Sequence, residues 1–250
     1  MPPLTLALLF LAGLSGGFID AIAGGGGLIT VPALLACGFS PQIALGTNKM
    51  QSSCGTVLVV WRYAKAEIMK TPWLWLAVIA SFLAAMGGAC TLGIVSNAFL
   101  KKLIPWMLAA VAAYTALNRH FGIHASMAKL TPLVFALLFG SLLGFYDGFF
   151  GPGTGSFWTV ALVALLGLGL REATGYTKAA NLASNLGSLI VFLFNQSVNF
   201  PAAGAMIAGQ LIGARLGSGM VIRRGAEFIR PVFLCVVFAM TLKLIWDGLH

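Results

Sequence analysis

Residues 17–49 read GFIDAIAGGGGLITVPALLACGFSPQIALGTNK, an apolar stretch that four consecutive glycines interrupt and that carries two charged residues, Asp20 and Lys49. The apolar run after the glycines, 28–37, covers only about 15 Å at 1.5 Å per residue. That is too short to cross a hydrocarbon core of roughly 30 Å. The stretch therefore predicts a hairpin that turns at Gly24–Gly27 inside a membrane and returns to the side it entered.

The composition of the whole chain supports a membrane location. Hydrophobic residues make up 59% of the 250 and charged residues only 8%, whereas a soluble domain carries about 25% charged residues. The net charge of +9 does not indicate a nucleic-acid surface, because the basic residues gather in a few connections, as in the positive-inside pattern. The four cysteines have no metal-ligand spacing, and we expect no metal, no cofactor and no catalytic residue.

Apolar runs of spanning length recur along the chain and predict an all-α polytopic membrane protein without a soluble domain. Two shorter runs, near 28–37 and 156–167, follow glycine-rich breaks. The long runs lie at about 4–23, 42–63, 73–94, 100–117, 131–150, 172–195, 201–222 and 229–247.

The distribution of basic residues predicts the orientation of the chain. If the connections that hold most of them face the cytoplasm, both termini lie outside a bacterial inner membrane. The adjacent Lys101 and Lys102 fall outside and are the one feature that resists this assignment. The connections are those with Arg62, Lys65 and Lys70, with Arg119 and Lys129, and with Arg223, Arg224 and Arg230.

An internal repeat relates the two parts of the chain. Residues 16–55 match residues 143–188 at an offset of 127, which becomes 129 after a two-residue insertion, and the matches include Asp20 with Asp147 and Lys49 with Lys178. The charge-derived topology gives the two parts opposite orientation, which is typical of secondary transporters. We therefore predict inverted repeats, each a glycine-broken re-entrant hairpin followed by three transmembrane helices. The first repeat is 1–120, with its hairpin at about 4–37, and the second is 121–250, with its hairpin at about 131–167.

Depth arithmetic places a binding site at mid-membrane, where each hairpin turn, its aspartate and the lysine of the same repeat converge. The helices that begin near Leu28 and Ser156 would point N–H groups and the positive end of the dipole at this centre, so an anion is the expected occupant. Buried lysines supply the charge, and hydroxyls and amides at helical spacing suit an oxyanion. The predicted substrate-binding residues are Lys49, Lys178, Asn48, Thr47, Ser52, Thr177, Asn181, Asn185, Gly25, Gly26, Gly153, Thr154 and Ser156.

The aspartates have two readings that the sequence leaves open. Asp20 and Asp147 either couple transport to an ion, with a proton as the candidate, or only neutralise the lysines as structural pairs. Three further residues are weaker gate or site-lining candidates: Arg215, Tyr146 and Gln210.

The segments that support this site also resemble a known family. Together with GFYDGFFGPGTGSFW (144–158) and GARLGS (213–218), the stretch 17–49 is similar to the TauE/SafE sulfite exporter family. The resemblance covers essentially the whole chain. It implies an eight-segment membrane protein that exports or imports sulfite, sulfonates and related sulfur-containing anions.

The sequence therefore predicts a secondary transporter of a small anion that works by alternating access, and the family resemblance implies that this anion contains oxidised sulfur. The alternatives are a transporter of non-sulfur organic anions, an anion channel, and an intramembrane enzyme that uses the aspartates as paired acids. No catalytic motif in the sequence supports the enzyme alternative. The direction of transport and the oligomeric state stay open, a homodimer included.

Overall fold

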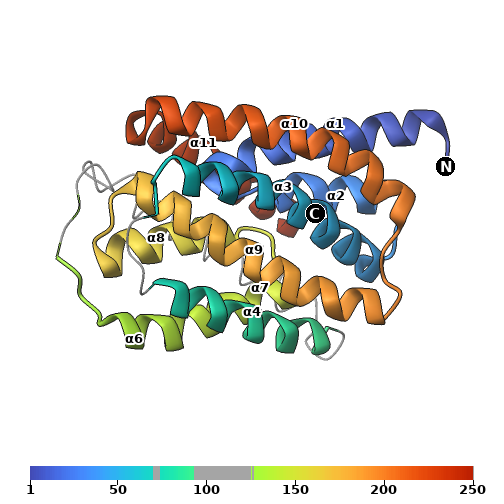
Figure 1. Cartoon of the computed structure of the whole chain (residues 1–250). Coiled ribbons are helices and arrows are strands. Elements are labelled where there is room, and N and C mark those ends of the chain that lie inside the picture. The colour runs from blue at the N-terminus through green and yellow to red at the C-terminus, as the bar shows by residue number, and fades with distance from the viewer. Residues whose placement is uncertain (70–73, 93–124, 126, 250) are drawn as a thin grey trace.

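The computed structural model describes residues 1–69, 74–92, 125 and 127–249, and every regular element in this part of the chain is helical (Figure 1). The first part contains α1 (Pro3–Ala23), α2 (Gly27–Ala36), α3 (Pro41–Lys65) and α4 (Trp75–Cys90). The second contains α6 (Pro132–Phe135), the π-helical turn η2 (Ala136–Gly140), α7 (Ser141–Phe149), α8 (Thr154–Leu166), α9 (Leu170–Phe194), α10 (Phe200–Arg224) and α11 (Ala226–Leu249).

These helices confirm the predicted all-α membrane class. Three of them are long and apolar enough to cross a membrane by length and composition: Pro3–Ala23, Pro132–Phe149 and Phe200–Arg224. The short apolar runs form α2 and α8, which are separate helices of 10 and 13 residues. The predicted span at 100–117 lies outside the described residues, as do Lys70, Lys101, Lys102 and Arg119.

The two glycine breaks meet inside the molecule. Gly24 caps the C-terminus of α1, and its φ of 77° is left-handed and favours glycine. The break before α8 contains Gly151 and Gly153 in the same backbone region. A Cβ on Gly155 would lie 2.5 Å from the Cα of Gly24, so the two backbones are in direct contact. In Figure 1, α2 lies toward the right and α8 toward the left, so the two hairpins approach this contact from opposite ends.

Backbone contacts recur in the two parts of the chain at a spacing of 129 residues. Among the described residues, the positive-φ residues other than glycine are Glu67 and Gln196, which follow α3 and α9 in the same kind of turn. In that turn, Ile68 N–H donates to the Tyr63 carbonyl and Ser197 N–H donates to the Phe192 carbonyl. The opposite orientation of the two repeats across a bilayer stays a prediction.

Glycines allow the long helices to pack backbone against backbone. On α10, Gly209 and Gly213 lie against the carbonyls of Phe10 and Leu14 of α1. On α7, Gly144 and Gly148 lie against the carbonyls of Ser81 and Ala85 of α4 in the same way. Small residues at four-residue spacing are the usual means of close helix contact in membranes. Because α1 packs on α10 and α7 packs on α4, each hairpin is held by a helix from the other part of the chain.

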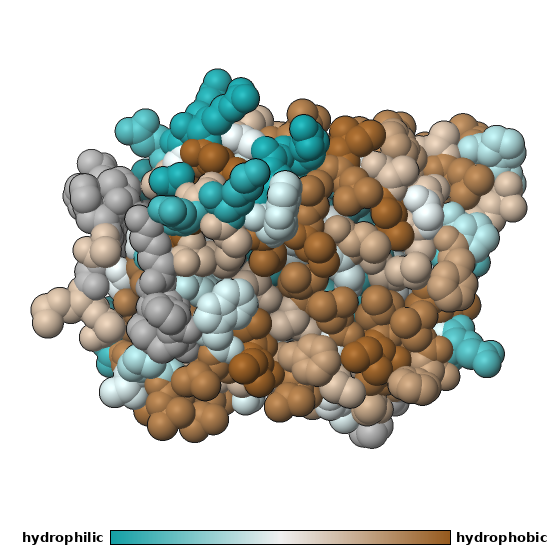
Figure 2. All heavy atoms as spheres, in the orientation of Figure 1, coloured by the Kyte–Doolittle hydropathy of each residue, from teal (hydrophilic) through white to brown (hydrophobic). Residues whose placement is uncertain are grey.

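Most of the described basic connections lie at one end of the molecule. Arg62 and Lys65 at the end of α3 line a pocket with residues of α10, and Lys129 N–H donates to the carbonyl of Leu165 at the end of α8. At the other end, the Asn199 N–H donates to the hydroxyl of Thr47 near the start of α3. Figure 2 shows the hydrophilic side chains gathered at the first of these ends, beside a broad apolar surface.

Candidate functional site

Two buried ion pairs occupy the centre of the molecule, and each joins the two parts of the chain. Lys49 Nζ of α3 lies 3.0 Å from Asp147 Oδ1 of α7. Lys178 Nζ of α9 lies 3.0 Å from Asp20 Oδ2 of α1. Each lysine therefore pairs with the aspartate of the other repeat and not with the aspartate of its own. The hairpins cross at Gly24 and Gly155, so each carboxylate faces the long helix of the other repeat.

The Lys49–Asp147 pair is held by further hydrogen bonds. Lys49 Nζ also donates to Asn185 Oδ1 at 3.1 Å, and the Ser184 hydroxyl donates to Asp147 Oδ2. The lysine side chain is 2% exposed and the aspartate 7%. This pair lies at the tip of the second hairpin, because a Cβ on Gly151 would come within 3.1 Å of both Lys49 Nζ and Asp147 Oδ1.

The Lys178–Asp20 pair is held by fewer contacts. Lys178 is fully buried, and beyond the ion pair with Asp20 its Nζ has no hydrogen-bond partner among the described residues. The Asp20 side chain is 15% exposed, and its Oδ1 accepts a long 3.4 Å hydrogen bond from Gly26 N–H. A buried ammonium has three N–H donors to satisfy, so Lys178 retains donor capacity that Lys49 has already used.

Further hydroxyls and amides are buried on α2 and on the helices that carry the two lysines. The Thr30 hydroxyl donates to Asn48 Oδ1 at 2.6 Å, and Gln51 Nε2 donates to the same oxygen at 2.9 Å and to the Ser52 hydroxyl at 2.9 Å. Two buried acceptors, Gln51 Oε1 and Asn181 Oδ1, have no hydrogen-bond partner in the described part of the chain. Buried polar atoms are rarely left unpaired, so these atoms mark polar space that a ligand or water can fill.

The predicted substrate-binding residues are all buried, but they do not all lie free at the centre. The hydroxyl of Thr47 accepts from Asn199 N–H, away from the ion pairs, and that of Thr177 lies 3.1 Å from the hydroxyl of Thr159. The hydroxyl of Thr154 donates to the Gly151 carbonyl and closes the second glycine turn. The Ser156 hydroxyl, 3.4 Å from the Ala23 carbonyl, links the two hairpins.

The helix N-termini at the centre are less open than the sequence predicted. Helix α2 begins at Gly27 and α8 at Thr154, close to the expected positions. The anion beside the first turn of α2 is the Asp20 carboxylate, which accepts from Gly26 N–H. A substrate anion at this end of α2 would have to displace or join that carboxylate.

The three weaker candidates lie in different places. Tyr146 donates its hydroxyl to the Pro152 carbonyl at 2.7 Å and so braces the second glycine turn. Gln210 is buried between α1 and α3, against Gly17 and Gly55, and its Oε1 has no partner among the described residues. Arg215 is exposed at the basic end of the molecule and lines the pocket there.

Sequence reasoning missed several residues that act at the site. Ser184 donates to Asp147, and Gln51 and Thr30 orient Asn48. Ser184 could have been found from helical spacing, because it follows Asn181 by three residues on the same face of α9. Thr30 could have been found from the internal repeat, in which it matches Thr159. Thr30 bonds Asn48 and Thr159 bonds Thr177, in each case a residue 18 positions later on the next long helix.

Comparison with known proteins gives the family. The model of the family described as sulfite exporter TauE/SafE matches residues 9–244. A probable membrane transporter protein from Haemophilus influenzae is 40% identical over 97% of this chain and 95% of its own length. The probable membrane transporter protein YfcA from Escherichia coli K12 is 38% identical over 98% and 91%, and the probable membrane transporter protein ORF9 from a Sinorhizobium species is 40% identical over 98% and 94%.

No solved structure matches the chain. The match to the family model spans nearly the whole sequence, and the relatives cover the chain from end to end with the same name of membrane transporter. The crossed ion pairs and the glycine-broken hairpins lie within the matched residues. The chain therefore belongs to the TauE/SafE family and is a membrane transporter.

Proposed function

We propose that this protein is a secondary transporter of small oxidised-sulfur anions, such as sulfite or organosulfonates, and that it carries them by alternating access through the central site. The observation that carries the proposal is the pair of buried lysines, each neutralised by an aspartate from the other repeat. The sulfur chemistry rests on the description of the family, and the anion preference rests on the lysines.

The substrate reaches a lysine by exchange with an aspartate. Lys178 is the better candidate, because among the described residues its Nζ has no hydrogen-bond partner beyond its ion pair with Asp20, whereas Asn185 and Ser184 also hold the Lys49–Asp147 pair. An oxyanion offers several acceptors to the N–H donors that Lys178 leaves unused. The carboxylate of Asp20 is also the more exposed of the two, so it can move with less rearrangement.

Charge balance links the anion to a cation. The four central side chains sum to zero charge, so a monovalent anion that enters alone leaves a net charge of −1 away from water. An uncompensated buried charge is costly, and a carboxylate that loses its cation is relieved when it takes up a proton. Asp20 is the acceptor we propose for that proton, which gives co-transport of one proton with each monovalent anion and no net movement of charge.

The orientation follows from the positive-inside rule. We propose that the basic end, with Arg62, Lys65 and Arg223, faces the cytoplasm of a bacterial cell and that both termini lie outside the inner membrane.

The test is flux in proteoliposomes with isethionate, a sulfonate that stays ionised across the working pH range. Internal pyranine reports proton uptake, and valinomycin with potassium clamps the membrane potential. We expect saturable uptake with coupled internal acidification and little dependence on the clamped potential. Lys178→Met should abolish both signals and Lys49→Met should reduce both, while Lys129→Met, an exposed lysine away from the centre, should transport normally.

Each other outcome removes a defined part of the proposal. Full flux in both central lysine variants would refute the site. Isethionate uptake that is driven by the membrane potential and occurs without internal acidification would refute proton coupling, but not anion transport. Preference for a carboxylate of similar size over isethionate and sulfite would replace sulfur with non-sulfur organic anions. Single-channel conductance in planar bilayers would make the protein a channel.

A further inference from the structure

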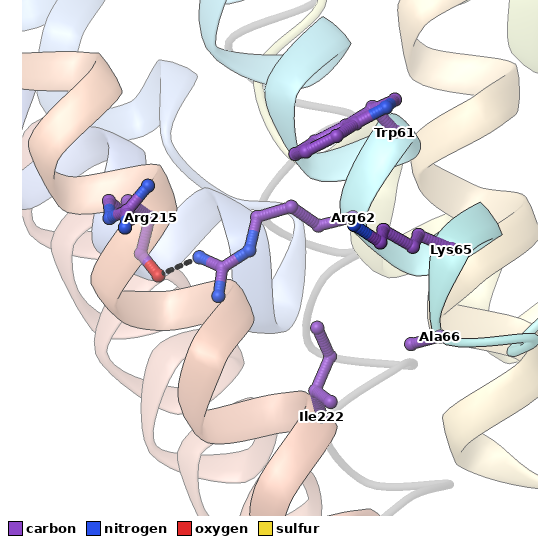
Figure 3. Close-up of a pocket in the computed structure, with 6 residues that line it drawn as sticks. All are labelled: Trp61, Arg62, Lys65, Ala66, Arg215 and Ile222. Carbon is purple, nitrogen blue, oxygen red and sulfur yellow. Dashed lines mark hydrogen bonds between the residues drawn. The ribbon is translucent and has the colours of Figure 1, made fainter.

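A basic pocket lies at one end of the molecule, between the last turn of α3 and the C-terminal half of α10, and none of the four central charged residues lines it (Figure 3). Its volume is about 340 Å³. The pocket is lined by Trp61, Arg62 and Lys65 of α3, by Ala66 directly after it, and by Arg215 and Ile222 of α10.

The three cations of this pocket are not neutralised. Arg62 reaches across to α10, where its guanidinium donates to the Arg215 carbonyl and, at 2.9 Å, to the Ser218 hydroxyl. Lys65 Nζ lies 5.5 Å from the centre of the Trp61 ring. In the described part of the chain, the ion pairs are those of Lys49 and Lys178, and no carboxylate pairs with Arg62, Lys65 or Arg215. A positive site without a counter-ion favours an anionic ligand.

The mouth of the pocket continues into apolar surface. Trp61 is 59% exposed, and Val57 lies one turn before it on the same face of α3 and is 49% exposed. On α10, Ile212 and Leu216 flank Arg215 and are 45% and 55% exposed. In a membrane protein such a surface faces lipid, and a Trp beside basic residues marks the depth of the headgroups. Figure 2 shows the hydrophilic cluster directly beside apolar surface.

We propose that this pocket binds one anionic phospholipid. Its phosphate is held by Lys65, Arg215 and the part of the Arg62 guanidinium that α10 leaves free, and an acyl chain lies along Val57, Trp61, Ile212 and Leu216. Basic pockets between transmembrane helices on the cytoplasmic side are suited to anionic headgroups. A free phosphate would use only the cations, whereas the adjoining apolar strip adds contacts that a lipid alone can make. The lipid would tie α3, which carries Lys49, to α10.

The test uses the full chain, purified in detergent and stripped of lipid. Thermal unfolding and native mass spectrometry are recorded with dioctanoyl phosphatidylglycerol, dioctanoyl phosphatidylcholine, glycerol 3-phosphate and inorganic phosphate. We expect phosphatidylglycerol alone to raise the unfolding temperature and to add one tightly bound lipid per chain. Lys65→Gln/Arg215→Gln should weaken its apparent affinity about tenfold or more, because it removes two of the three cations that line the pocket and would contact the phosphate.

The matched control is Arg223→Gln, which removes an exposed arginine of α10 outside the pocket and should leave the affinity unchanged. If the double variant does not fold, Lys65→Gln alone serves, since the recorded contact of that side chain is with the Trp61 ring. Equal binding of phosphatidylcholine, an equal loss in Arg223→Gln, or the same stabilisation from inorganic phosphate would overturn the proposal. None of these outcomes bears on the central transport site.

Discussion

Lys49 and Asp147 come from different repeats of the chain, yet their charged atoms lie 3.0 Å apart in the buried centre. The equivalent pair, Lys178 with Asp20, lies at the same distance. Removing one member of a buried pair leaves the other as an uncompensated charge, which costs about 3–5 kcal/mol. The pairs therefore make the packing of one repeat depend on the other.

The crossed pairing predicts which second substitution restores stability. Lys49→Met should lower the unfolding temperature strongly, by the equivalent of about 3–5 kcal/mol, because Asp147 keeps its charge without a partner. Adding Asp147→Asn should recover most of that loss. Adding Asp20→Asn should recover nothing and should cost more, because it strands Lys178 as well. Thermal unfolding in detergent distinguishes the two double variants, and rescue by Asp20→Asn would contradict the crossed geometry.

Removing both charges of the Lys178–Asp20 pair should abolish transport but leave stability nearly unchanged. The double variant Lys178→Met/Asp20→Asn removes both charges together, so we expect it to unfold close to the wild-type temperature. It should nevertheless fail to transport, because both the cation for the substrate and the proposed proton acceptor are gone. Isethionate flux in proteoliposomes, normalised to reconstituted protein, is the measurement. Wild-type flux in this variant would mean that the pair is purely structural.

The contact between the hairpins predicts a steric effect. Gly155→Ala places a methyl group 2.5 Å from the Gly24 backbone, so the two tips must separate, at a cost of roughly 1–3 kcal/mol. Isethionate flux should also fall in Gly155→Ala, because the hairpin tips position Asp20 and Asp147. The matched control is Gly87→Ala in α4, where an added Cβ meets nothing within 4 Å. Equal behaviour of the two variants would show that the tip contact does not matter.

The repeated turns after α3 and α9 offer a matched test of orientation. Glu67 and Gln196 are both exposed and occupy the same backbone position, 129 residues apart, at opposite ends of the molecule. With the native cysteines replaced, Glu67→Cys should be labelled by a membrane-impermeant maleimide only after the cells are opened. Gln196→Cys should be labelled in intact cells. The reverse pattern would place the basic end outside.

Sequence reasoning predicted the helices well because a membrane simplifies the pattern. The runs at 4–23, 172–195 and 201–222 lie within a few residues of α1, α9 and α10, since apolar length alone sets a span. The short helices α2 and α8 were also placed correctly, because glycine breaks and length left little choice.

The same reasoning could not predict which aspartate pairs with which lysine. Depth arithmetic gives each residue one coordinate, its height in the membrane, and it put Asp20, Asp147, Lys49 and Lys178 at a common height. It does not give the direction in which each helix presents its side chains, which depends on how the repeats pack. Gly13 and Gly17 of α1 lie against α10. Without that packing, the sequence does not show that Asp20 faces a lysine of the other repeat. The inequality of the two pairs depends on Ser184 and Asn185, which only side-chain geometry reveals.

The crossed pairs also determine when each buried charge meets its partner during synthesis of the chain. Asp20 and Lys49 enter the bilayer with the first repeat, but Asp147 follows Lys49 by 98 residues and Lys178 follows Asp20 by 158 residues. At roughly 5–20 residues per second, the first repeat waits several seconds or longer with two charges unmatched. During that interval the insertion machinery must shelter it. A ribosome that stops early leaves an unmatched half that quality-control proteases can recognise by its stranded charges.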